Sequence, residues 1–254
     1  PWVELIASRT NTGFTGGNNL ALRRCRGRYV LLLNPDTRIV GDALSSLLGY
    51  MRGHPRVGVV GPRLTYGDGS AQSSRRRFPT MMMALMESTL LELWFPNNRW
   101  ARAYHMADTP DDLVQEVDWV TGACMLVRRE AIEQVGLLDE RFFMYSEELD
   151  WCRRMADAGW RAVYYPRAVV MHYEGKSSDQ VVAARHIRFE TSKVLYFHKH
   201  HGRTKAGLLR LFLLGTYVLR LMEEGAKYLL GHKRFLRKPR IKAYAQVLRS
   251  GLRP

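Results

Sequence analysis

Cysteine is scarce in this chain. Its 254 residues include only Cys25, Cys124 and Cys152, and no two of them form a C-x-x-C pair. An odd, widely spaced set argues against a disulfide framework and a zinc ribbon, and favours a reducing compartment. We expect Cys124 and Cys152 to pack in the interior, since neither has an activating neighbour in the sequence.

Acidic residues are also few, and the imbalance is local. The chain has 39 Lys and Arg against 24 Asp and Glu, a net charge of +15. Residues 1–198 carry 25 basic and 22 acidic groups, net +3, whereas residues 199–254 carry 14 and 2, net +12. Such a tail suits a polyanion, either anionic lipid or nucleic acid. A nucleic-acid binder would spread basic and aromatic residues over a broad surface, so we expect no nucleic-acid partner.

Long uninterrupted hydrophobic runs are absent. Residues 208–230 are strongly apolar, but only nine residues separate Arg210 from Arg220, whereas a membrane-spanning helix needs roughly 20 apolar residues. A helix lying in a membrane interface, beside the basic run 233–242, is favoured over a helix that caps the domain core. We therefore expect residues 205–254 to form a basic amphipathic helical tail.

Apolar runs alternate with helix-like stretches in the first 80 residues. We expect strands over residues 3–7, 29–33 and 57–60, helices over 20–26 and 42–52, and a hairpin-type turn at Asp68-Gly69. The continuous run 29–33 is typical of a strand buried on both faces. This alternation predicts an α/β fold with a largely parallel sheet.

Beyond residue 80 the alternation of apolar runs with helix-like stretches stops. We expect a Met- and Leu-rich helix over 81–95, a loop over 96–112 and β-like structure over 117–128. Helices should follow over 130–135 and 146–158, the second with Ser146 as its N-cap, and then short strands over 162–165 and 169–172.

A Gly- and Asn-rich turn, Asn11-Thr-Gly-Phe-Thr-Gly-Gly-Asn-Asn19, lies between the first expected strand and helix. Glycines allow close approach of a ligand, and a helix N-terminus attracts phosphate. The turn is neither a P-loop nor a G-x-G-x-x-G fingerprint. A purely structural tight turn is about as well supported.

Two further candidate site residues, Asp36 and His172, stand where expected strands end. Asn34-Pro35-Asp36 follows an apolar run, where open parallel sheets bind ligands, so Asp36 could hold a divalent cation that bridges phosphates. The alternative is a strand-ending turn. His172 follows another apolar run, and a lone histidine there is more often a hydrogen-bonded structural group than a ligand.

Carboxylates and guanidinium groups each form one cluster. Ser146-Glu-Glu-Leu-Asp150 places three acids in one helical turn, which raises the pKa of at least one and suits a general base. Acids also belong in a first turn, and Asp150 can pair with Arg154, so we assign Asp150 a structural role and leave Glu147 and Glu148 open. The run Arg75-Arg76-Arg77 fits either a solvated loop or a phosphate grip.

The order of the motifs is more informative than any one of them. The chain contains, in sequence, Asn11-x-Gly-Phe-x-Gly-Gly-x-Asn19, Leu33-Asn-Pro-Asp36, Asp118-Trp-Val-Thr-Gly-Ala-Cys-Met-Leu-Val-Arg128, Gly136-Leu-Leu-Asp-Glu-Arg-Phe-Phe-Met-Tyr145, Glu147-Glu-Leu-Asp-Trp-Cys152 and Val170-Met-His172 with Gly175-x-Ser-Ser178. This series resembles the family 2 glycosyltransferases, in particular the bacterial rhamnosyltransferase-like branch, over roughly residues 5–200.

The resemblance implies a GT-A fold, a Rossmann-like α/β architecture with a mixed central sheet and C-terminal amphipathic helices. Residues 1–204 would form the glycosyltransferase domain, with a donor half over about 1–80 and an acceptor half over about 117–204, followed by the tail 205–254. The implied reaction is inverting transfer of a hexosyl or rhamnosyl group from a nucleotide-sugar, assisted by Mg²⁺ or Mn²⁺.

Metal and catalytic roles follow from the same resemblance. Asp36 matches the family's metal-binding aspartate, while Asn34 occupies the first acidic position. His172 matches a histidine that approaches the metal or the diphosphate, and a nitrogen ligand favours Mn²⁺ over Mg²⁺. The catalytic base would be Glu148, one methylene longer than the usual aspartate, with Glu147 as the fallback.

Substrate contacts complete the implied site. The residues expected to bind the donor are Asn11, Gly13, Phe14, Gly17, Asn19, Asn34, Thr121, Gly122 and Ala123. Those expected at the acceptor or the phosphates are Trp119, Asp139, Arg76 and Arg77. Trp119 suits stacking on a sugar and burial in the core equally well.

The family's first strand and its Val-Asp-Asn-x-Ser-x-Asp-like segment, which bind the nucleotide, have no counterpart before Val3. We expect the chain as given to lack its first β-α unit and to bind nucleotide poorly, while its full-length parent is an enzyme. The alternative is a non-catalytic binding or scaffold relative. The expected acceptor is a glycan, in particular a lipid-linked one, used in cell-surface polysaccharide synthesis at the cytoplasmic face of the plasma membrane.

Overall fold

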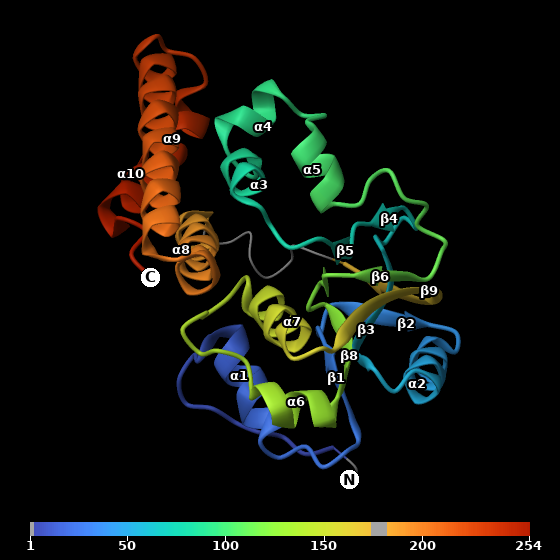
Figure 1. Ribbon diagram of the computed structural model, residues 1–254. Helices are drawn as coiled ribbons and strands as arrows, with labels where there is room; N and C mark the ends of the chain where they lie inside the picture. Colours follow the sequence, from blue (N-terminus) through green and yellow to red (C-terminus); the bar gives the residue numbers. More distant parts are fainter. Residues whose placement is uncertain (1–2, 174–181) are drawn as a thin grey trace. The chain divides into compact units, whose positions relative to one another are not determined.

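The computed structural model describes residues 3–173 and 182–254 (Figure 1). These residues form two compact units. Residues 3–78 and 102–173 make up one, here called the α/β unit, and residues 79–101 and 182–254 make up the other, the helical unit. This division differs from the boundary expected near residue 204, because the segment 79–101 and the helix before residue 204 group with the C-terminal helices.

A seven-stranded sheet forms the centre of the α/β unit. Its order is β1 (Tyr29–Leu33), β8 (Cys124–Arg128), β3 (Val57–Thr65), β9 (Arg161–His172) and β2 (Thr37–Val40), with β4 (Ala71–Gln72) on β3 and β6 (Gln115–Val117) on β9. Among the described strands of this sheet, only β3 and β9 pair in parallel. The sheet is mixed, so the prediction of a largely parallel sheet, made from the alternation of strand-like and helix-like segments, is wrong. Apolar periodicity carries no information about strand direction.

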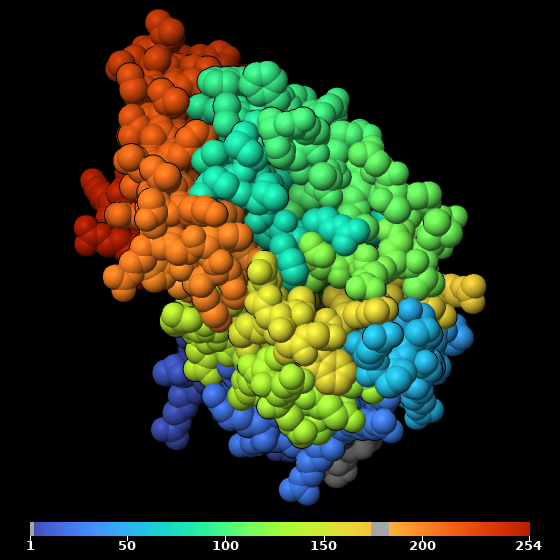
Figure 2. Space-filling model, in the orientation of Figure 1, coloured from blue at the N-terminus to red at the C-terminus, as the bar shows by residue number. Residues whose placement is uncertain are grey.

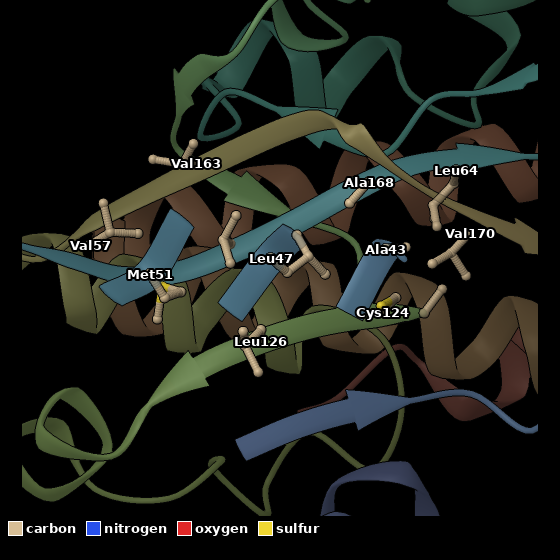
Figure 3. Close-up of a cluster of buried hydrophobic side chains, with 12 residues drawn as sticks. Ala43, Leu47, Met51, Val57, Leu64, Cys124, Leu126, Val163, Ala168 and Val170 are labelled. Atoms are coloured by element: carbon tan, nitrogen blue, oxygen red, sulfur yellow. The ribbon is translucent and has the colours of Figure 1, made fainter. Parts of the chain in front are cut away.

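The main core lies between α2 (Ala43–Gly53) and the central strands. Figure 3 shows its side chains converging from α2, β3, β8 and β9. The strand β3 is buried along almost its whole length, as the apolar run 57–60 predicts. On the other side of the sheet are α6 (Arg129–Val135) and α7 (Glu147–Asp157), which contact β8 and β9 respectively (Figure 1).

Three expectations for the first 40 residues need correction. Residues 3–7 form no strand. The strand β1 has the predicted bounds, but its burial alternates and Leu33 is 40% exposed, because β1 is the end strand of the described order and pairs only with β8. The first helix, α1, spans Gly13–Leu22 rather than 20–26, since Gly13 at φ +72° starts it within the glycine turn.

Two later elements also differ in detail. The strands expected over 162–165 and 169–172 are one strand, β9, whose pairing with β3 shifts register between Pro62 and Arg63. The helix α7 forms as predicted, but the side chain of Ser146 makes no capping hydrogen bond. Ser146 lies at φ +65°, so the chain enters the helix through a left-handed residue instead.

The helical unit contains α3 (Met81–Met86), α4 (Leu90–Trp94), α8 (Val182–His201), α9 (Arg203–Leu229) and α10 (Arg234–Ser250). The single helix expected over 81–95 is broken at Ser88, which has φ +62°. Thr80 and Thr89 cap the two pieces, accepting bonds from Met83 N and Leu91 N at 3.2 Å. The stretch 96–112 is also not all loop, since it contains α5 (Arg99–Tyr104).

Buried charges hold the segment 79–101 to the long helices. Lys193 of α8 lies 3.1 Å from Glu87 Oε2 and 3.5 Å from Glu190 Oε2. Burial alone would lower the pKa of Lys193, but the two carboxylates outweigh it and raise that pKa. Arg220 of α9 donates to the carbonyl of Ser88 at 2.8 Å.

Among the described helices, none combines the length and apolar character that crossing a bilayer requires.

Candidate active site

A cavity of about 310 Å³ opens in the α/β unit. Its wall is formed where the ends of several strands meet the start of α1 and of α7. The residues that line it are Phe14, Asn34, Leu64, Tyr66, Gln72, Ser73, Arg76, Thr121, Gly122, Ala123, Met144, Tyr145, Glu147, Glu148 and His172. Nine of these were singled out in the sequence, from motifs as far apart as Phe14 and His172.

Both glutamates face this cavity because of how α7 begins. Tyr145 and Ser146 have φ values of +73° and +65°, a left-handed bend that turns the chain into the helix. Glu147 is only 4% exposed. Both residues line the cavity, and within the described residues Glu147 Oε2 and Glu148 Oε2 are buried without a hydrogen-bond partner, an arrangement that calls for an explanation in a folded protein.

The two carboxyl groups differ electrostatically. Burial raises the pKa of Glu147 well above its ordinary value, and the neighbouring Glu148 raises it further. Burial also raises the pKa of Glu148, but hydrogen bonds from backbone amides and the charge of Arg76 oppose that rise. One of those bonds comes from Gly122 N, 3.4 Å from Glu148 Oε1. Of the two carboxyl groups, Glu148 is therefore the better placed to be ionised.

The Thr121-Gly122-Ala123 segment forms another wall. Thr121 N donates to Ser74 O at 3.0 Å, and Asn34 N donates to Ala123 O at 2.9 Å, so backbone bonds fix the segment. The hydroxyl of Thr121 is buried and has no partner among the described residues. Next to it, a Cβ on Gly122 would make only ordinary contacts, 3.6 Å from Phe14 and 3.8 Å from Glu148.

Asp36 does not line the cavity, but it contacts a residue that does. Asp36 Oδ1 lies 3.4 Å from His172 Nε2, and the other ring nitrogen, Nδ1, lies 3.0 Å from Gln72 Oε1. Tyr173 N donates to the carbonyl of Asp36 at 2.9 Å. An adjacent carboxylate oxygen and imidazole nitrogen fit Mn²⁺ well. The described residues contain no cluster of three or more His, Cys, Asp or Glu able to hold a metal, so Asp36 and His172 alone would supply only part of a coordination shell.

The three consecutive arginines have separate roles. Arg75 is buried and donates to the carbonyls of Thr109 and Pro110 at 2.5 and 2.6 Å. Arg77 pairs with Asp118 at 3.3 Å and is not among the cavity residues. Only Arg76 lines the cavity. Successive side chains that face different surroundings are typical of an extended segment, and residues 75–76 form the short strand β5 (Arg75–Arg76).

Several residues of the glycine turn lie away from the cavity. Asn19 is buried and bonds Leu138 O and Glu140 Oε1, both at 2.9 Å, which clamps α1 to the loop before α7. Asn11 Oδ1 accepts a bond from Gly13 N at 3.0 Å. Gly13 allows close packing, since a Cβ there would lie 2.2 Å from Phe143 O. Gly17 is exposed on α1. Of this turn, only Phe14 reaches the cavity.

Trp119 and Asp139 are likewise not among the cavity residues. Trp119 is buried and donates from Nε1 to Arg77 O at 3.0 Å, which matches its core alternative. Asp139 pairs with Arg141 at 2.6 Å.

The structural roles inferred from the sequence are confirmed for three residues. Asp150 is fully buried and accepts a bond from Arg154 Nε at 2.9 Å. Cys124 and Cys152 are buried free thiols, and burial raises the pKa of each to about 12. Gly175, Ser177 and Ser178 of the last motif lie outside the described residues.

Sequence reasoning missed part of the wall. Tyr66, Gln72 and Ser73 belong to the hairpin that joins β3 to β4, whose Asp68-Gly69 turn is visible in the sequence, yet no pattern shows that the hairpin folds over the cavity. Met144 and Tyr145 stand in the quoted Phe-Phe-Met-Tyr motif. Their position just before Glu147 and Glu148 was the signal in the sequence that could have placed them at the cavity.

Comparison with known proteins identifies the family of the chain. The family profile described as Glycosyltransferase like family 2 matches residues 3–188. The chain is 34% identical to N-acetylglucosaminyl-diphospho-decaprenol L-rhamnosyltransferase of Mycobacterium tuberculosis, covering 76% of this chain and 62% of that protein. It is 28% identical to the rhamnosyltransferase WbbL of Escherichia coli, covering 63% and 61%. The chain thus spans about three fifths of the length of these relatives.

Solved structures show the same fold. The mannosyltransferase PcManGT from Pyrobaculum calidifontis, in complex with GDP-Man and Mn²⁺, superimposes with a TM-score of 0.51 at 16% identity, covering 96% of this chain and 67% of that one. GalNAc-T7 with UDP, GalNAc and Mn²⁺ gives 0.50 at 11% identity, covering 75% and 35%. The long profile match, the rhamnosyltransferase relatives and this shared architecture together make the chain a member of glycosyltransferase family 2, with the α/β fold of the GT-A enzymes.

Proposed function

We propose that the protein transfers a sugar, with inversion, from a nucleotide-sugar to a glycan acceptor. The observation that carries this proposal is that three residues lining one cavity, Thr121, Glu147 and Glu148, each bury a side-chain oxygen that has no hydrogen-bond partner among the described residues. A hydroxyl-rich ligand would satisfy all three, and unpaired buried oxygens are costly unless something binds them.

Glu148 acts as the general base in this proposal. It takes the proton from an acceptor hydroxyl, whose oxygen then attacks the anomeric carbon opposite the leaving diphosphate. Gly122 N–H and Arg76 favour its ionised form, while Glu147 remains protonated and donates a hydrogen bond to a sugar hydroxyl. Because burial raises the pKa of Glu148, the rate should rise with pH through an ionisation above that of an ordinary glutamate.

Asp36 and His172 hold the divalent cation, Mn²⁺ in preference to Mg²⁺, in this proposal. Bound there, the cation supplies positive charge that offsets the charge of the leaving diphosphate. Arg76 is the cavity's cationic side chain and binds the phosphates from the β5 side. Asn34 and Thr121 orient the donor. Alignment and charge stabilisation should contribute more than proton transfer.

The relatives indicate the substrates. The Mycobacterium tuberculosis relative is named for L-rhamnosyl transfer and for N-acetylglucosaminyl-diphospho-decaprenol, and the Escherichia coli relative is named a rhamnosyltransferase. We therefore propose a rhamnosyl donor and a lipid-linked glycan acceptor, used in cell-surface polysaccharide synthesis.

Release of nucleoside diphosphate from a panel of nucleotide-sugars, with Mn²⁺ or Mg²⁺ and an acceptor, tests the proposal. Glu148→Gln should lower kcat at least about 100-fold, since general-base help is typically worth 10²–10⁴-fold, and should leave the donor KM little changed. Glu133→Gln, an exposed glutamate on α6, is the matched control.

Two outcomes would count against this mechanism. A large loss in Glu147→Gln with normal turnover in Glu148→Gln would move the base to Glu147. Donor binding without turnover in the unaltered protein would favour the non-catalytic binding or scaffold alternative.

A further inference from the structure

The outer face of α9 is an apolar stripe. Its exposed large side chains are Leu208, Leu211, Val218, Leu219, Met222 and Leu229, each between 44% and 78% exposed. Apart from the adjacent pair Val218 and Leu219, they follow one another at intervals of three or seven residues, which places them on one side of the helix. The stripe runs from residue 208 to residue 229 of α9, about 33 Å at 1.5 Å per residue.

Five charged residues interrupt this apolar stretch; Glu223 and Lys227 are exposed and pair with each other, whereas the other three bond within the helical unit. Arg210 donates to Gly251 O at 2.5 Å, and Arg220 donates to Ser88 O at 2.8 Å. Glu224 is buried and accepts bonds from Arg237 at 2.8 and 2.9 Å. All three are therefore satisfied within the helical unit, which leaves the outer face free of their charge.

Positive charge and further apolar side chains gather where α9 turns into α10. Leu230 and Phe235 are 84% and 76% exposed there. Glu223 and Glu224 are the two acids of residues 199–254, and they pair with Lys227, Arg237 and Arg240. No described carboxylate pairs with the exposed lysines and arginine nearby, which are Lys233, Arg234, Lys238 and Lys242.

We infer that α9 and the α9–α10 turn bind the surface of an anionic membrane, with the stripe lying at the boundary between headgroups and acyl chains. A long helix with one apolar face beside unpaired basic residues is suited to that position. Figure 2 shows α9, in orange, at the molecular surface. The net charge of +12 on residues 199–254 selects anionic lipid over a second copy of the same basic surface.

Vesicle flotation tests this inference without any sugar transfer, so its outcome is independent of the proposed function. The protein should float with vesicles of phosphatidylcholine and phosphatidylglycerol, float poorly with phosphatidylcholine alone, and release as salt is raised. Replacing both Lys233 and Arg234 by glutamine should weaken binding roughly 25-fold, because each basic residue contributes about fivefold.

Leu211→Glu is the sharper variant. Its side chain is 70% exposed, so the fold should persist, as circular dichroism and thermal melting would verify. Vesicle affinity should fall at least about tenfold, the value of burying one leucine. Leu113→Glu makes the same chemical change at a 53% exposed leucine of the α/β unit and should leave binding intact.

Unchanged vesicle binding by Leu211→Glu would overturn the inference, as would failure of the unaltered protein to float at low salt. A concentration-dependent dimer in light scattering, abolished by Leu211→Glu and accompanied by no vesicle binding, would instead assign the stripe to a second copy.

Discussion

At the scale of single residues, two adjacent glutamates in the same helical turn have different surroundings. Glu148 receives a hydrogen bond from Gly122 and the favourable charge of Arg76, whereas Glu147 has the unfavourable charge of Glu148 beside it. The sequence predicted that crowding would raise at least one pKa. It could not say which, because Gly122 and Arg76 are 26 and 72 positions from Glu148 in the sequence.

This difference predicts how Glu147→Gln changes stability with pH. Because the pKa of Glu147 is raised in the folded state, folding retains a proton that the unfolded chain releases above about pH 4.5. The stability contribution of this group is thus fully present below that pH and is lost as pH rises toward the folded pKa. Because glutamine does not titrate, Glu147→Gln removes this loss and should be more stable than the unaltered protein at pH 7.5.

Urea unfolding at pH 4.5 and pH 7.5 checks this prediction. The advantage of Glu147→Gln should shrink at the lower pH, and Glu133→Gln should show no such trend. Destabilisation by Glu147→Gln at both pH values would mean that the carboxyl group makes native contacts that glutamine cannot replace.

At the scale of elements, the glycine turn shows how a motif can be placed correctly and interpreted only in part. The turn does join the N-terminal stretch to a helix that begins at the cavity, but its glycines serve packing. Gly13 adopts φ +72° and lies against the backbone of Phe143, whereas Gly17 faces open space. Phe14, between them, is the residue that reaches the cavity.

These two glycines of α1 predict opposite responses to alanine. Gly13→Ala would place a Cβ 2.2 Å from Phe143 O in a left-handed conformation, and should destabilise the α/β unit by about 2–4 kcal/mol. Gly17→Ala, with no atom within 4 Å of its Cβ position, should be neutral or stabilise by up to about 1 kcal/mol. Thermal melting of both variants tests the pair, and equal effects would contradict the geometry.

At the scale of the whole molecule, the chain leaves the α/β unit after residue 78 and returns at 102. The two ends of that excursion are neighbours, because Arg77 N donates to Tyr104 O at 2.9 Å. The excursion itself belongs to the helical unit, where Lys193 and Arg220 bind Glu87 and Ser88. The sequence shows that the alternation of strand-like and helix-like segments stops after residue 80. It does not show that residues 79–101 group with helices that lie a hundred residues later in the chain.

Replacing residues 79–101 by a short Gly-Ser linker should therefore destabilise the helical unit and leave the stability of the α/β unit unchanged. Hydrogen exchange should show β3 and β8 still protected, because their partners are all retained. Amides of α8 should exchange at least about tenfold faster, since α8 would lose both the segment that packs against Lys193 and the Glu87 carboxylate that pairs with it. Loss of protection in β3 would show that the α/β unit depends on the excursion.

The sequence by itself determined the family, the positions of most strands and helices of the α/β unit, and most of the side chains that line the cavity. It could do so because apolar periodicity is local and the motif residues occur in a fixed order. It did not determine strand direction, the roles of Asn19 and Gly13, or the separate orientations of Arg75, Arg76 and Arg77. Each of those depends on contacts between residues far apart in the chain. The clearest case is α9, where the arginines that interrupt an apolar run are bonded inside the helical unit, so that only the tertiary structure shows the outer face to be continuous and apolar.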